Sequence, residues 1–200
     1  MMKSRVFVVA FLTLLIAAAC SSSPKSRFYT LDVAYEGPTR ALNDFQIGVG
    51  PFEMVRYLDR PQIVTRGAGN RLTINEFDRW ADALPDRFNR VLARNLVLAT
   101  GSTSILAHPW RRDFDAKYRV TGVVDRFEAD RDGTVVLEVR WAILGVADSM
   151  VEETFRAVYT RDAKLDDFGA IASAMSHVVA DFAADIATDL ATRPALPAQQ

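Results

Sequence analysis

The sequence feature that most restricts the fold is a continuous apolar stripe along the C-terminal segment, from Asp166 to about Ala191. Apolar side chains recur every three or four residues over roughly six or seven turns, the spacing of one α-helical face. They are Phe168, Ile171, Met175, Val178, Val179, Phe182, Ile186 and Leu190. A helix with this stripe has to be covered by another layer, so it predicts a sheet with a matching apolar face.

The segment before this helix predicts that sheet as a three-strand antiparallel meander. Strands are expected at 117–128 and 134–144, around the turn Asp130-Arg131-Asp132-Gly133, where glycine permits the positive φ of a hairpin. Inward residues alternate along the second strand at Val135, Leu137, Val139, Trp141 and Ile143. The third strand is marked by Val151, Phe155 and Tyr159. The last helix is therefore expected to pack on this meander.

The N-terminal half adds shorter elements. Strands are expected at 28–33 and at 45–50, the second one closed by Pro51. A core-packing helix should begin near residues 82–86 and end at Thr100, before Gly101. A strand at 103–106 would then complete a βαβ crossover with some parallel pairing. We therefore expect one α+β domain, α/β-like in its order of elements, with a mixed β-sheet and two main helices.

Each of the two helices carries a row of like charges whose role the pattern leaves open. The first helix has Arg87, Arg90 and Arg94. The last helix has Asp181, Asp185 and Asp189. Either row is a solvated face, or the arginines meet an acidic partner or lipid headgroups and the aspartates a basic partner.

Residues 1–19 have the pattern of a signal peptide. Lys3 and Arg5 precede an apolar run from Val6 to Ala19, interrupted only by Thr13. A membrane-spanning helix needs roughly 20 apolar residues, so this run has the length of a signal-peptide core. Cleavage is expected after its small residues.

Cys20, the only cysteine, directly follows Ala17-Ala18-Ala19 and cannot form an internal disulfide. This arrangement resembles the lipobox of bacterial lipoproteins, with Ala17 in place of the usual leucine. We expect Cys20 to carry covalent acyl chains such as palmitate; an ordinary secretory signal and a retained anchor are the alternatives. Ser21 after the cysteine favours the outer membrane. Residues 20–27 form the lipidated tether, 28–191 the folded domain and 192–200 a flexible tail.

Catalytic and nucleic-acid chemistry have no support in the sequence. His108 and His177 lack metal-ligand spacing, and the adjacent Glu152 and Glu153 would point to opposite faces of a strand. The segment 48–50 lacks the third glycine of a nucleotide-binding loop. The formal net charge is −1, with both signs interspersed. We expect no enzyme, no cofactor apart from the lipid on Cys20, no metal and no nucleic acid.

The most specific stretch is YLDRPQIVTR at 57–66, followed by NRL at 70–72 and EFDRWAD at 76–82. It predicts a bent approach to Pro61, a strand at 62–66, a four-residue turn and a strand at 71–75. The amino-acid sequence of these stretches resembles that of the PqiC family, the auxiliary lipoprotein components of ABC-type transport systems. Supporting segments are FYTL, GVGP and RVLARNL. The sequence departs from the family pattern at Asp82-Ala83-Leu84, which leaves the start of the next helix open.

This resemblance implies a topology like that of anticodon-binding domains or the TolB N-terminal domain, without nucleic-acid function. It implies a periplasm-facing subunit that docks an MCE-domain protein and its permease for intermembrane phospholipid transport and envelope integrity; a homo-oligomer would suit a ring-shaped partner. We expect partner contacts at Tyr57, Leu58, Asp59, Arg60, Pro61 and Arg66. The alternative for the segment is that it only fixes the hairpin to the core. The alternative for the protein is a carrier that itself binds a lipid or other apolar ligand between the last helix and the meander.

Overall fold

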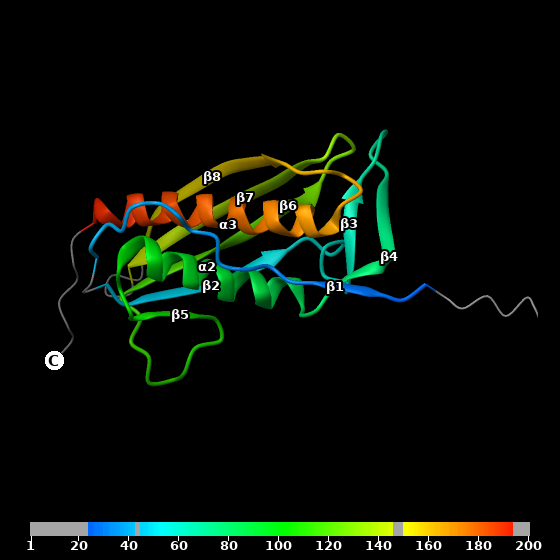
Figure 1. The fold of residues 1–200 in the computed structure, drawn as a ribbon. Coiled ribbons are helices and arrows are strands. Elements are labelled where there is room, and N and C mark those ends of the chain that lie inside the picture. The colour runs from blue at the N-terminus through cyan, green and yellow to red at the C-terminus, as the bar shows by residue number, and fades with distance from the viewer. Residues whose placement is uncertain (1–23, 43–44, 146–149, 194–200) are drawn as a thin grey trace, which may run out of the picture.

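The computed structural model describes residues 24–42, 45–145 and 150–193, which form one mixed sheet covered by two helices (Figure 1). The first elements are β1 (Arg27–Tyr29), β2 (Ile47–Met54), β3 (Gln62–Arg66), β4 (Leu72–Trp80) and α2 (Leu84–Thr100). They are followed by β5 (Ile105–Ala107), β6 (Tyr118–Ala129), β7 (Thr134–Gly145), β8 (Met150–Asp162) and α3 (Phe168–Ala191). The expected single α+β domain is confirmed. Cys20 and most of the predicted signal, tether and tail lie outside the described residues.

Strand β6 is the centre of the sheet. On one side it pairs along its length with β7, which pairs with β8, so the predicted antiparallel meander is confirmed. On the other side it pairs in parallel first with β2 and then, through Ala129 and Thr65, with β3. Strand β5 adds to β2 in parallel, which confirms the crossover through α2. Strand β4 pairs antiparallel with β3 and parallel with β1.

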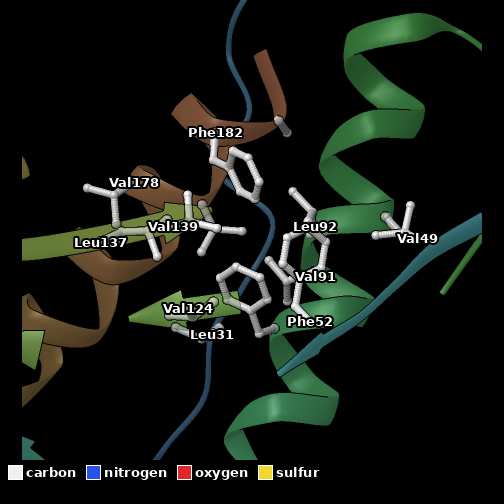
Figure 2. Close-up of a cluster of buried hydrophobic side chains, with 14 of the residues drawn as sticks. Leu31, Val49, Phe52, Val91, Leu92, Val124, Leu137, Val139, Val178 and Phe182 are labelled. Carbon is white, nitrogen blue, oxygen red and sulfur yellow. The ribbon is translucent and has the colours of Figure 1, made fainter. Parts of the chain in front are cut away.

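The core lies between the sheet and the two helices, which run side by side over one face (Figure 1). The ring of Phe182 of α3 packs edge-on against the rings of Phe52 and Trp141, with ring centroids 5.6 Å and 5.5 Å apart. Figure 2 shows Phe182 among aliphatic side chains from both helices and the sheet. Helix α3 has the length and composition of a membrane span, but 67% of its most apolar window is buried inside the domain. It therefore covers the meander as predicted.

Three predicted boundaries were wrong. Pro51 does not close its strand: β2 continues to Met54, and a register shift between Val49 and Phe52 takes up the residue that cannot donate to the ladder. The hairpin strand predicted at 71–75 extends to Trp80, because β1 adds a second partner along its last residues. Conversely, β1 ends at Tyr29, after which the chain leaves the sheet.

Candidate functional site

The segment between β2 and β3 carries most of the residues predicted to meet a partner. Its chain turns twice: the amide of Leu58 donates to the carbonyl of Val55 at 2.9 Å, and that of Arg60 to the carbonyl of Leu58 at 2.9 Å. The carbonyl of Pro61 then accepts from the amide of Trp80 at 2.7 Å. These bonds lead the chain into β3 with Pro61 just before the ladder, as its missing N–H requires.

A fully buried carboxylate lies beneath this segment. Glu128 of β6 is 0% exposed, and its oxygens accept from the Tyr57 hydroxyl at 2.9 Å and from Arg66 Nε at 2.8 Å. They also accept from Arg126 Nε at 3.1 Å and from the backbone amide of Phe127 at 3.0 Å. Arg66 Nη2 donates to the Tyr57 hydroxyl at 3.3 Å, which closes the network. A buried charge requires such partners, because desolvation of an unpaired carboxylate is very costly.

The electrostatics of this network keep Tyr57, Arg66 and Arg126 each in one protonation state. Burial, followed by the negative charge of Glu128, raises the pKa of Tyr57 to about 12. Burial alone would lower the pKa of Arg66, but the hydrogen bond to Glu128 and the negative charge of Glu128 together outweigh burial, so the pKa is raised above its ordinary value. The same balance raises the pKa of Arg126. Tyr57 therefore remains a neutral donor and both arginines remain charged across the physiological pH range.

The structure separates the predicted contact residues into two groups. Tyr57 and Arg66 are brought together around Glu128, and Leu58 is 3% exposed in the core. Asp59 and Pro61 are exposed at the turn, with the half-buried Arg60 between them. The Nε atom of Arg60 is buried and has no hydrogen-bond partner among the described residues. Of the predicted set, the turn Asp59–Pro61 is the part that faces outward.

Sequence reasoning missed Glu128 altogether. A glutamate in a strand with apolar alternation is normally taken for a solvent-facing residue. Its burial results from Tyr57 and Arg66, which are 71 and 62 positions away in the chain. The one local signal is Arg126, whose guanidinium donates both to Glu128 and, from Nη2 at 2.8 Å, to Asp130. That signal is too common in strands to identify a buried charge.

The other candidate residues form no reactive arrangement in the described parts of the chain. His177 Nδ1 donates to the carbonyl of Ser173 at 2.8 Å, as a helix-bound histidine does. Within the described ranges, no group of three or more His, Cys, Asp or Glu side chains could hold a metal ion. Asp185 of the acidic row accepts from the Tyr159 hydroxyl at 2.7 Å, and burial together with this bond raises the pKa of Tyr159.

The space between α3 and the meander can be compared with the predicted carrier groove. A hollow of about 230 Å³ lies there, lined by Trp141, Phe155, Tyr159 and Asp185 among others. Pockets for small molecules typically enclose roughly 300–1,000 Å³. Because Phe182 and its neighbours fill the layer beneath, this hollow is small for an acyl lipid.

Comparison with known proteins gives one family and several solved structures. The family model described as ABC-type transport auxiliary lipoprotein component matches residues 29–187. Among curated proteins, none matches the sequence significantly. Protein XCC0632 from Xanthomonas campestris is similar in structure with a TM-score of 0.69, at 19% identity over 83% of this chain and 95% of that one. An uncharacterized protein has a TM-score of 0.67, at 16% identity over 84% and 99% of the two chains. These structures confirm the fold.

Proposed function

Because the chain belongs to the family of ABC-type transport auxiliary lipoprotein components, we propose that it is a non-catalytic lipoprotein subunit of an MCE-type lipid transport system. In this role, acyl chains on Cys20 hold the domain at the periplasmic face of the outer membrane. The domain receives the MCE-domain protein, which spans the periplasm from its permease. Those partners carry out the transport, and this chain holds the MCE-domain protein at the outer membrane.

The observation that carries the proposal is the fixed conformation of the turn Asp59–Pro61. On one side of the turn Tyr57 is bonded to Glu128, and on the other side Arg66 is bonded to the same carboxylate. The turn therefore projects from two anchored ends. A surface that is already ordered loses less conformational entropy on binding, so its contacts contribute more to affinity.

The two groups of residues have different roles in this proposal. Asp59, Arg60 and Pro61, the exposed and half-buried residues of the turn, would contact the partner. Tyr57, Leu58 and Arg66 would hold the turn in place, so their loss would act through the conformation of the loop. Interface residues that lie at a rigid, partly desolvated centre contribute most of the binding energy.

A pull-down of the full-length protein from native membranes tests the proposal. The variants Asp59→Arg and Arg60→Ala should reduce recovery of an MCE-domain subunit by about ten-fold or more each, because hot-spot residues cost about 2 kcal/mol. Asp132→Arg, the same charge change at the exposed turn between β6 and β7, is the matched control. Cells carrying the turn variants should also lose detergent resistance. Normal recovery with both turn variants would reject docking at this turn.

A further inference from the structure

Two large apolar side chains are exposed on the paired strands β1 and β4. Phe28 of β1 is 64% exposed and Phe77 of β4 is 42% exposed. Phe28 is the direct partner of Arg79 in the parallel β1–β4 pair, and Phe77 lies two residues before Arg79 on the same strand. Residues two apart on a strand point to the same face, so Phe28 and Phe77 are diagonal neighbours on one surface. We name this surface the Phe28–Phe77 face.

The exposure of Phe28 is fixed by the residues on either side of it. Arg27 Nε lies 2.8 Å from Asp78, and the Tyr29 hydroxyl donates to the same carboxylate at 2.9 Å. Asp78 is only 6% exposed, so these contacts hold β1 firmly on β4. Because successive side chains of a strand alternate, Phe28 points away from the Asp78 side. It has no described core surface to pack against in that direction.

The position of Phe28 in the chain indicates what covers it. It lies eight residues after Cys20, a span of at most about 28 Å when fully extended and roughly 15 Å as a flexible coil. Figure 1 shows β1 and β4 side by side at the end of the molecule where the described chain begins. A membrane that holds acyl chains on Cys20 is therefore within reach of this face.

We propose that the Phe28–Phe77 face rests in the lipid headgroup region of the membrane that holds the anchor. This inference rests on the proposed lipoprotein function. Aromatic side chains with cationic neighbours are the residues that proteins place at this depth. Arg79, the direct partner of Phe28, lies on this face, and the exposed Lys25 comes three residues before Phe28. The acyl chains alone hold the protein on the membrane, while the aromatic contact determines which end of the domain faces the lipid.

This orientation also places the docking turn. Arg79 pairs with Phe28 on one side and with Gln62 of β3 on the other, and Gln62 directly follows Pro61. Two strand spacings amount to about 10 Å. A partner bound at Asp59–Pro61 would therefore meet the domain at the membrane surface, where a lipid could pass directly between partner and bilayer.

Photocrosslinking of the full-length protein in cells tests this inference. The photoreactive residue p-benzoylphenylalanine replaces Phe28 or Phe77 in two samples, and Leu98 or Val158 in two controls. These control side chains are apolar and 46% and 57% exposed, but they lie on α2 and β8. After irradiation, mass spectrometry identifies the molecule attached at each position. We expect phospholipid adducts at positions 28 and 77 in about ten-fold excess over the controls, as partitioning of the face into lipid requires.

Three results would overturn the inference. Protein adducts in place of lipid adducts at 28 and 77 would identify the face as part of a protein interface. Equal lipid yields at all four positions would show that the face has no preferred contact with the bilayer. Mass analysis of Cys20 in the same samples distinguishes the causes, because an unmodified Cys20 refutes the anchor itself. An acylated Cys20 without adducts refutes only the membrane face, and the turn variants test partner docking independently.

Discussion

The substitution Glu128→Gln tests whether the buried carboxylate holds the docking segment. Glutamine has nearly the same shape but no charge, and its amide group would face guanidinium donors. Arg66 would then lose its partner charge, whereas Arg126 would keep its ion pair with Asp130 at 2.8 Å; the two arginine side chains are 26% and 28% exposed. The Tyr57 hydroxyl would keep at most one weaker acceptor.

The size of the effect follows from the burial of the pair. Removal of one partner from a fully buried ion pair costs about 3–5 kcal/mol. Water reaches both arginines here, so we expect Glu128→Gln to lower the free energy of unfolding by about 2–4 kcal/mol. For a domain of this length each kcal/mol corresponds to about 2–4 °C in Tm, which gives a fall of roughly 4–16 °C.

Urea denaturation followed by circular dichroism measures the effect. The matched control is Asp125→Asn, which neutralises a carboxylate on the same strand; its partner Arg140, at 2.7 Å, is 53% exposed. The control should cost no more than about 1 kcal/mol, as exposed pairs do. Costs within about 0.5 kcal/mol of each other would refute the argument that burial gives Glu128 its structural weight.

Three further changes have definite expected outcomes. The pKa of Tyr57 is raised to about 12, so the contribution of the neutral hydroxyl to stability is complete below pH 10, the ordinary pKa of tyrosine, and is lost as the pH rises toward 12. Tyr57→Phe should reduce this alkaline loss in the free energy of unfolding by about 1–2 kcal/mol, measured by urea denaturation. An unchanged dependence of the unfolding free energy on pH would contradict this. A Cβ at Gly122 would overlap the carbonyl oxygen of Arg140, so Gly122→Ala should force β6 and β7 apart and cost more than about 2 kcal/mol by thermal unfolding. Phe182→Ala empties the centre of the core and should cost about 3–5 kcal/mol, with retained stability showing that neighbours such as Trp141 collapse into the space.

The C-terminal half of the fold could be predicted from the sequence because its signals are local. The alternation along β7 and the stripe along α3 each extend over many residues, and each implies the other as its cover. Gly101 ends α2 in the left-handed conformation with φ of 74°, as a glycine after a helix predicts.

The failures concern residues whose role is set by distant partners. Pro51 marks the end of a strand by local rules, yet parallel pairing with β6 resumes at Phe52 after a shift in register. Glu128 has the pattern of a surface residue, and only the folded chain brings Tyr57 and Arg66 over it. The docking segment was predicted only because its amino-acid sequence resembles that of a family. Its division into anchored and outward-facing residues required the structure.

The parallel step from β3 to β6 has a mechanical consequence. Tension applied along the N-terminal segment would reach the rest of the domain by two routes. One is the chain after β1, where Leu31 and Asp32 are bonded to α2 and α3, and the other is the pairing of β1 with β4, which leads into the hairpin. At that joint the ladder has a single register pair, Thr65 with Ala129. The Arg66–Glu128 ion pair lies directly beside it and crosses the same gap. Under the proposed lipid anchoring, part of a pull from the membrane would therefore load this ion pair in parallel with very little backbone pairing. Neutralising Glu128 should lower the force needed to separate β3 from β6.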